Sequence, residues 1–256
     1  MKKRYLLFLF IVFIFSTRNV KAKDIHIVGL GDSITTGYGV SKEDSYFYLL
    51  VKEIDKKNSG NVVFENLSQN GLTSTQLLSQ LGNESVQEKV RKTDYIFMSI
   101  GGNDFLEEFT TNYQTYFIPK ETYTSFEEVK NNLLANMDKI TRQIYDLNPD
   151  CKVILVPLYN PYRTILGDNE NLLKQFDDAK SKYIEVVKQV KNMEISDELG
   201  TELEKQEYLN TTGMKNLDPH PNQKGHELIF KMEKELLEES GIIEKSSNNT
   251  YLLFIG

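Results

Sequence analysis

The stretch IHIVGLGDSITTGYG, residues Ile25–Gly39, decides the fold class. Its first six residues are nearly all apolar and include β-branched side chains, and glycines and polar residues follow at once. A short run that is apolar on both faces is typical of a strand buried inside a parallel sheet. The stretch therefore predicts a buried strand that ends in a turn carrying Asp32 and Ser33.

Four more β-rich apolar runs follow along the chain, and segments with helical spacing of apolar residues separate them. Alternating strands and helices predict a doubly wound α/β fold with a parallel sheet, in which ligands bind beyond the C-terminal strand ends. Ser125 and Glu128 have the spacing of a capping box, which predicts a helix start there. The other strands are expected at Val62–Leu67, Tyr95–Ile100, Lys152–Pro157 and Asn192–Ile195, and the helices at Glu43–Lys56, Thr73–Leu81, Ser125–Leu147, Asn169–Val190 and Asn222–Glu239.

The composition is that of a globular protein with one sizeable core: 256 residues, 39% hydrophobic and 26% charged. The net charge is −7 for the whole chain and −12 for the part after residue 22. An acidic surface repels the phosphates of nucleic acids, so no nucleic-acid partner is expected. Cys151 is the single cysteine, which excludes an intramolecular disulfide.

Residues 1–22 have the pattern of a secretory signal peptide. A basic segment, Lys2–Arg4, precedes the apolar run Tyr5–Phe15, and Val20, Lys21 and Ala22 have the residue spacing of a cleavage site. A membrane anchor is the alternative, but the run is about half of the roughly 20 residues that a spanning helix needs. We therefore expect cleavage after Ala22, a single domain over residues 23–256, and secretion to the extracellular or cell-wall space.

Ser33 stands at a strand-to-helix turn, where a backbone N–H is free to face an anion. The surrounding glycines do not match a phosphate loop, a dinucleotide fingerprint or the nucleophile elbow of α/β-hydrolases. Taken alone, the turn favours a plainer interpretation, in which Asp32 and Ser33 only cap the next helix.

Gly71 and Asn103 occupy the turns after the second and third expected strands. A glycine leaves its N–H open to a ligand, and the Asn103 amide offers a second donor, with Asp104 able to brace the turn. Each residue also has a plainer interpretation, as a turn glycine or as an Asx turn without function.

The chain has three histidines. His26 lies inside the first strand and is expected to be structural, whereas His226 lies in the last helix and is expected at the surface or behind the site. His220 is held between Pro219 and Pro221, which stiffen the backbone. His220 is therefore the best candidate for a general base, which a serine needs to become a nucleophile.

Taken together, these turns resemble the four blocks of the SGNH (GDSL-type) esterase/lipase hydrolases, and most closely a bacterial secreted lysophospholipase/acylhydrolase branch. The resemblance spans about residues 25–237 and implies a three-layer α/β/α sandwich with a flavodoxin-like parallel five-stranded sheet. The four matching blocks are GDSIT around Ser33, Gly71 after Asn70, GGND around Asn103 and HPNQKGH from His220.

The resemblance implies that Ser33 is the nucleophile and His220 the base, with an oxyanion hole made by the Ser33 and Gly71 N–H groups and the Asn103 side chain. It implies no cofactor, and we expect no metal site because the sequence shows no ligand cluster.

The chain departs from the family pattern before the histidine. Members usually place the orienting aspartate three residues before it, but that position is Leu217 here, and the nearest acid is Asp218, two residues before. Asp218 is the expected third member of the triad, and the alternative is that a backbone carbonyl takes this role.

The implied function is that of a serine ester hydrolase that works through an acyl-enzyme. The apolar segments Phe105–Pro119 and Leu158–Gly167 favour an acyl or lipid ester such as a lysophospholipid, although core or lid packing would also explain them. The alternatives are a carbohydrate O-acetyl esterase and, less favoured, a non-catalytic binding protein on the same fold. The apolar tail Tyr251–Gly256 predicts an extra strand or a contact with a membrane or partner, and the oligomeric state stays open.

Overall fold

The computed structural model describes residues 24–58, 60–116, 118, 120–167, 169–241 and 243. The predicted signal peptide and the apolar tail Tyr251–Gly256 lie outside these residues. In the described part, no helix is both long enough and apolar enough to cross a membrane.

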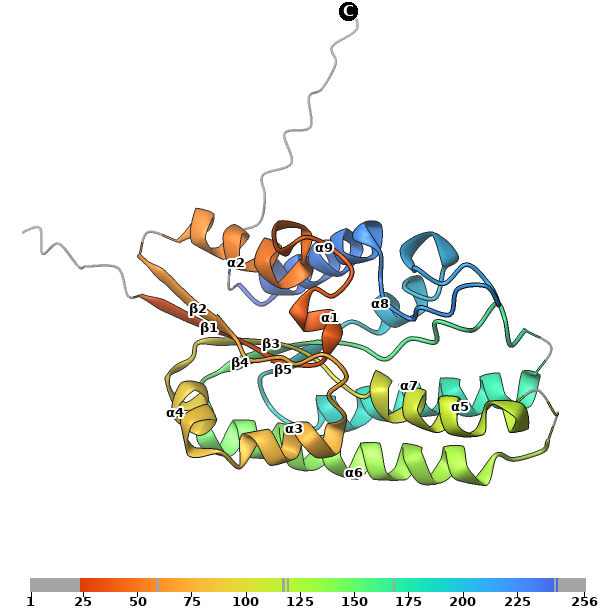
Figure 1. The fold of residues 1–256 in the computed structure, drawn as a ribbon. Coiled ribbons are helices and arrows are strands. Elements are labelled where there is room, and N and C mark those ends of the chain that lie inside the picture. The colour runs from red at the N-terminus through yellow and green to blue at the C-terminus, as the bar shows by residue number, and fades with distance from the viewer. Residues whose placement is uncertain are drawn as a thin grey trace, which may run out of the picture.

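A parallel sheet of five strands, in the order β2-β1-β3-β4-β5, forms the middle layer of the described chain (Figure 1). Helices cover both faces of the sheet, so the predicted three-layer α/β/α sandwich is confirmed. Gly31 pairs with Ser99, and Ser99 pairs with Val156, so the C-terminal ends of three neighbouring strands lie side by side. The strands are β1 (Ile25–Gly31), β2 (Val62–Asn66), β3 (Tyr95–Ser99), β4 (Lys152–Val156) and β5 (Met193–Ile195).

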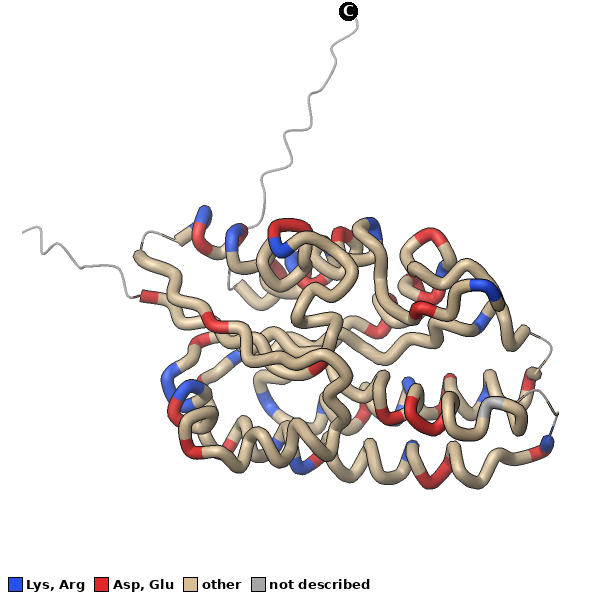
Figure 2. The backbone as a smooth tube through the Cα atoms, viewed as in Figure 1, with Lys and Arg blue, Asp and Glu red and all other residues tan. Residues whose placement is uncertain are grey.

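The two helical layers differ in size (Figure 1). One face of the sheet carries α1 (Ser33–Thr36), α2 (Tyr46–Lys57), α8 (Asp197–Glu202) and α9 (Gln223–Glu239), with short 3₁₀ turns at Lys42–Asp44 and Gln206–Tyr208. The other face carries α3 (Ser74–Leu81), α4 (Glu84–Lys92), α5 (Gly102–Tyr116), α6 (Thr124–Leu147) and α7 (Glu170–Lys188). Charged residues of both signs are intermingled over both layers (Figure 2).

The central strands are apolar throughout because each of them feeds two cores. In β3, Ile96 and Met98 belong to the core under the larger helical layer, whereas Phe97, between them, belongs to the core under α2 and α9. In β4, Leu155 likewise belongs to the core under the larger helical layer, and Ile154 belongs to the core under α2 and α9. Burial on both faces explains why these strands could be read from uninterrupted apolar runs.

Several helix bounds differ from the expectation. The helix expected from Glu43 begins at Tyr46, because Lys42–Asp44 form a 3₁₀ turn and Ser45 caps α2 by accepting from the Tyr48 N–H at 3.4 Å. The capping box predicted at Ser125 is wrong, since α6 begins at Thr124 and its N-cap residue makes no side-chain cap bond.

Three helices were not predicted: α4, α5 and α8. The most consequential is α5, because it contains most of the aromatic-rich segment Phe105–Pro119, for which no secondary structure was predicted. Its backbone leaves helical geometry at Asn112 (φ −119°, ψ 24°), so two helical pieces meet at a kink. The aromatic side chains of this stretch therefore stand on a helix beside the strand ends.

Candidate active site

The turn after β1 requires a glycine at position 31. Gly31 has φ +99°, and a Cβ there would lie 1.8 Å from the Ser99 carbonyl oxygen of the neighbouring strand. Asp32 then caps α1 by accepting from the Ile34 N–H at 3.1 Å, as the capping interpretation predicted. This turn places Ser33 at the first position of α1, at the C-terminal edge of the sheet.

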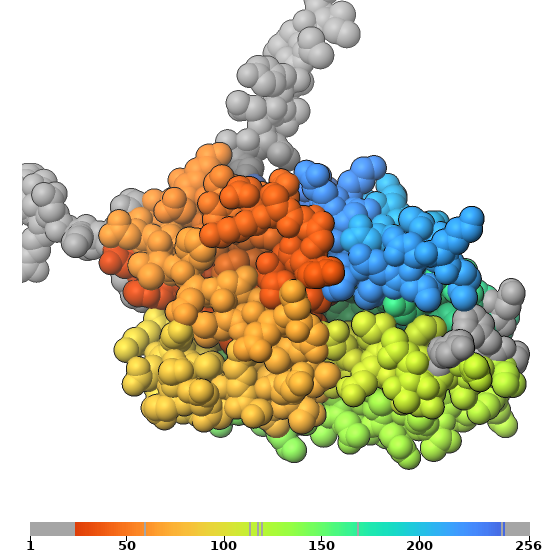
Figure 3. Space-filling model, viewed as in Figure 1, coloured from red at the N-terminus to blue at the C-terminus, as the bar shows by residue number. Residues whose placement is uncertain are grey.

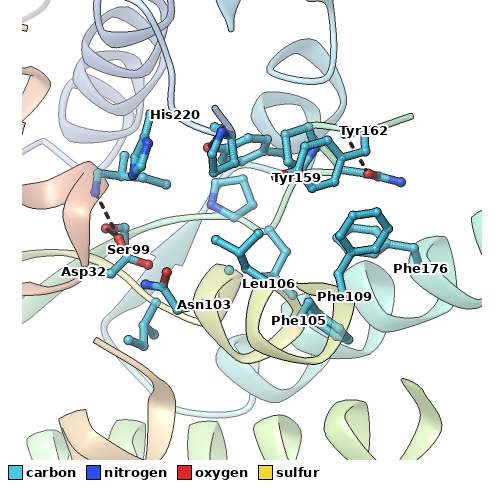
Figure 4. Close-up of a pocket in the computed structure, with 18 of the residues that line it drawn as sticks. Asp32, Ser99, Asn103, Phe105, Leu106, Phe109, Tyr159, Tyr162, Phe176 and His220 are labelled. Carbon is cyan, nitrogen blue, oxygen red and sulfur yellow. Dashed lines mark hydrogen bonds between the residues drawn. The ribbon is translucent and has the colours of Figure 1, made fainter. Parts of the chain in front are cut away.

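Ser33 and His220 come together from opposite ends of the chain. The Ser33 Oγ lies 2.9 Å from His220 Nε2, and the Asp218 Oδ1 lies 2.6 Å from His220 Nδ1. Figure 4 shows His220 above Asn103, at one end of a pocket. A hydroxyl on one ring nitrogen and a carboxylate on the other is the arrangement that activates a serine by general-base catalysis.

The two-residue spacing between Asp218 and His220 is accommodated by an Asx turn. The same Oδ1 that meets the imidazole also accepts the backbone N–H of His220, at 3.1 Å. A side chain that bonds the backbone two residues ahead folds back over the intervening residue, which here is Pro219. The carboxylate therefore reaches its own histidine although it is one residue nearer than the family pattern.

Tyrosine side chains hold the His220 loop in place. The Tyr159 hydroxyl donates to the Pro219 carbonyl at 2.8 Å, and the Tyr162 hydroxyl donates to the Leu217 carbonyl at 2.9 Å. Tyr38 covers the imidazole, with ring centroids 4.4 Å apart. Tyr159 and Tyr162 were predicted only to line a groove, because their hydrogen-bond partners are backbone carbonyls 60 and 55 residues away in the chain.

Gly71, in the loop after β2, and Asn103, in the first turn of α5, both follow strands at the C-terminal edge of the sheet. The Asn103 amide donates to the Leu72 carbonyl at 3.0 Å, which leaves its second N–H available. Gly71 has φ +79°, and no atom of the described chain outside Gly71 and its two neighbours lies within 4 Å of the position where a Cβ would stand. The preceding residue, Asn70, accepts from the Thr36 hydroxyl at 2.6 Å, which ties this loop to the nucleophile turn.

Two acids, the buried Asp32 and the half-buried Asp104, brace the turns behind these donors. Asp32 accepts from the Ser99 hydroxyl at 2.5 Å, and its burial raises the pKa of the carboxyl group. Asp104 accepts from both the N–H and the hydroxyl of Ser74, at 2.9 and 2.6 Å. Asp104 therefore joins α5 to α3 and braces the turn that carries Asn103, as the sequence predicted.

A cavity of about 100 Å³ extends from Ser33 and His220 between α5 and the segment after β4 (Figure 4). Leu106 and Phe109 line one side and Tyr159 and Tyr162 the other. Further apolar side chains line the cavity, among them Phe105, Phe126, Leu172 and Phe176. Such a space can take an apolar chain attached to a carbonyl group at Ser33.

Among the described residues, no group of three or more His, Cys, Asp or Glu side chains could hold a metal ion. His226 is fully buried on α9, where its Nδ1 accepts from the Tyr46 N–H of α2, so of its two predicted positions the one at the surface is wrong. His26 lies in β1, as expected.

Residues 30–228 match the model of the GDSL-like lipase/acylhydrolase family. The chain is 28% identical over 222 residues to the uncharacterized protein YpmR of Bacillus subtilis (strain 168), covering 85% of this chain and 83% of that protein. It is 24% identical over 145 residues to the spore germination lipase LipC of Bacillus licheniformis, covering 55% and 66% of the two chains. A solved structure, the lipase Lip_vut3 from a goat rumen metagenome, superposes with a TM-score of 0.65 at 20% identity and covers 82% of this chain and 96% of its own.

Fold and site together define a hydrolase of carboxylic esters. The chain belongs to the GDSL-like lipase/acylhydrolase family, and the predicted membership of the SGNH (GDSL-type) family is thereby confirmed.

Proposed function

We propose that this enzyme hydrolyses esters of apolar acyl chains, with lysophospholipids as one substrate class, through an acyl-enzyme on Ser33. His220 Nε2 takes the proton as the Ser33 Oγ attacks the ester carbonyl, and Asp218 stabilises the imidazolium that forms. The oxyanion is held by the N–H groups of Ser33 and Gly71 and by the Asn103 amide.

The second half of the reaction returns the enzyme to its starting state. The ester C–O bond breaks, His220 gives its proton to the departing alcohol, and the acyl group stays on Ser33. Water then attacks the acyl-enzyme while His220 again takes the proton, and the carboxylic acid leaves. No step requires a group other than the protein and water.

The observation that carries the substrate class is the cavity beside Ser33. The side chains that line it include those of Leu106, Phe109, Phe105 and Phe176, which offer apolar contacts and no charge. Burial of one methylene group contributes about 0.8 kcal/mol. Each methylene that enters the cavity should therefore raise kcat/KM about fourfold.

A series of p-nitrophenyl esters from two to twelve carbons tests this proposal. We expect kcat/KM to rise from acetate through the medium chains and to stop rising once the cavity is full. Leu106→Trp, which fills the cavity near Asn103, should move the optimum to shorter chains without lowering the rate with acetate.

An enzyme that removes acetyl groups from carbohydrate would not need such a cavity. Preference for the acetate ester alone, with no gain from longer chains, would contradict the acyl-ester proposal and favour the O-acetyl esterase. Secretion is a further proposal, supported by the signal-peptide pattern of residues 1–22.

A further inference from the structure

Exposed apolar side chains gather beside the candidate active site. Tyr38, Met214 and Leu217 are 48%, 63% and 39% exposed, and they account for half of the large apolar side chains that are exposed in the described part of the chain. Tyr38 contacts the His220 ring, and Met214 and Leu217 lie in the segment that leads to His220. Single exposed apolar residues are ordinary, but a cluster at the opening of an apolar cavity indicates an interaction site.

The segments that carry these side chains form a continuous rim. A Cβ on Gly39 would lie 3.3 Å from the Asn210 amide, so the turn after α1 lies against the start of the segment 210–217. Thr36 bonds Asn70, which joins the loop after β2 to the same turn. We call residues 33–41, 66–76 and 210–217 the rim; Figure 3 shows these red, orange and blue regions meeting near the centre of the view.

The rim is almost free of charge. Its 28 residues include one charged side chain, Lys215, whereas 26% of the whole chain is charged. A surface that enters the headgroup region of a lipid layer gains from exposed apolar side chains and is hindered by charges that lose water. The composition of the rim fits such a surface.

We propose that the rim docks on zwitterionic phospholipid bilayers, with Tyr38, Met214 and Leu217 inserted between the headgroups. This inference rests on the proposed function, because the rim would then let an acyl chain pass from the lipid layer into the cavity beside Ser33. The proposed attraction between the rim and the bilayer comes from apolar side chains and not from opposite charges. The charge of −12 carried by the residues after position 22 opposes binding to anionic lipids.

Vesicle binding by the Ser33→Ala variant tests the proposal without turnover. We expect this variant to sediment with phosphatidylcholine vesicles, and Met214→Gln combined with Leu217→Gln to weaken the partitioning about tenfold. Glutamine is chosen as the replacement because it adds no charge beside Asp218. The matched control is Val63→Gln, which changes an apolar side chain that is 50% exposed on the edge strand β2, toward the N-terminal ends of the strands.

The same double substitution in the active enzyme separates docking from catalysis. Hydrolysis of dissolved p-nitrophenyl butyrate should stay within about twofold, and hydrolysis of an ester embedded in vesicles should fall about tenfold. A thermal unfolding curve shows that each variant is folded.

The docking proposal is overturned if Ser33→Ala does not bind vesicles, or if it binds them equally with and without the Met214→Gln and Leu217→Gln substitutions. Binding of a neutral oligosaccharide at the rim in place of vesicles would overturn it as well. Loss of all ester hydrolysis in the wild-type enzyme would instead contradict the proposed function, since vesicle binding is measured without turnover.

Discussion

His220 and His226 belong to the same segment, HPNQKGH, but one lies in the loop at the strand ends and the other on the buried face of α9. The His220 side chain is 20% exposed, and its two ring nitrogens face Ser33 and Asp218. His226 is fully buried, its Nδ1 accepts from the Tyr46 N–H at 3.4 Å, and burial lowers its pKa to about 4. Partners and access to water, and not closeness in sequence, decide which histidine can take up a proton.

Replacing His220 tests the first half of this comparison and should have the largest effect. We expect His220→Ala to lower kcat/KM at least about 10⁴-fold, because Ser33 then has no base, while the melting temperature changes little. His226→Asn is the contrasting variant, whose Oδ1 can still accept from Tyr46. The comparison fails if this variant, folded, loses as much activity as His220→Ala.

Replacing Asp218 should have the second-largest effect on activity. Asp218→Asn removes the negative charge beside His220 Nδ1, so we expect kcat to fall at least about 100-fold. Asp197→Asn, an exposed carboxylate in α8, is the control and should leave kcat unchanged. A change of only a few-fold for Asp218→Asn would mean that Ser33 and His220 work as a dyad.

The burial of His226 predicts a loss of stability in acid. Its pKa falls from 6.5 to about 4 on folding, so below pH 6.5 the unfolded chain binds a proton that the folded chain does not. The stability that the neutral ring provides is present above pH 6.5 and is lost as the pH falls toward 4, by about 3 kcal/mol in all. Urea unfolding of wild type and His226→Asn at pH 7.5, 5.5 and 4.5 measures how the free energy of unfolding depends on pH. An equal pH dependence in the two proteins would contradict the prediction.

Glu233 lies on the same helix and should give the smallest effect, with the opposite sign. It is fully buried, neither carboxylate oxygen has a hydrogen-bond partner among the described residues, and burial raises its pKa well above the usual value. Its protonated form favours the folded state below pH 4.5, and that stability is lost as the pH rises.

Glu233→Met removes the free-energy cost of burying a carboxyl group without hydrogen-bond partners. We expect the free energy of unfolding at pH 8 to increase by about 1–3 kcal/mol, with a smaller gain at pH 4.5. Destabilisation by the substitution at pH 8 would show that the Glu233 carboxyl makes a favourable interaction there.

The sheet could be predicted from the sequence because β1, β3 and β4 are buried on both faces and leave uninterrupted apolar runs. The helix α5 could not, because aromatic and threonine residues between Phe105 and Tyr116 fit a groove-lining loop as well as a helix. Its helical form depends on packing against α6 and on the hydrogen bonds that Asp104 accepts from Ser74, contacts that no local pattern contains.

The candidate site, too, could be predicted from the sequence only in part. The positions of Ser33, Gly71 and Asn103 at one edge could be predicted because each follows a strand, and parallel strands end at the same edge of the sheet. His220 could be singled out because two prolines flank it. The Asx turn that brings Asp218 to its own histidine could not, since a spacing of two residues does not fix the direction of a carboxylate. The burial of His226 depends equally on a distant helix, α2, which covers it.

Labelling with a fluorophosphonate tests the central claim, that Ser33 is a nucleophile activated by His220, most directly. We expect wild-type enzyme to be labelled on Ser33 alone, Ser33→Ala not to be labelled, and His220→Ala to be labelled far more slowly while it remains folded. Labelling of another residue, or labelling of His220→Ala at the wild-type rate, would contradict it.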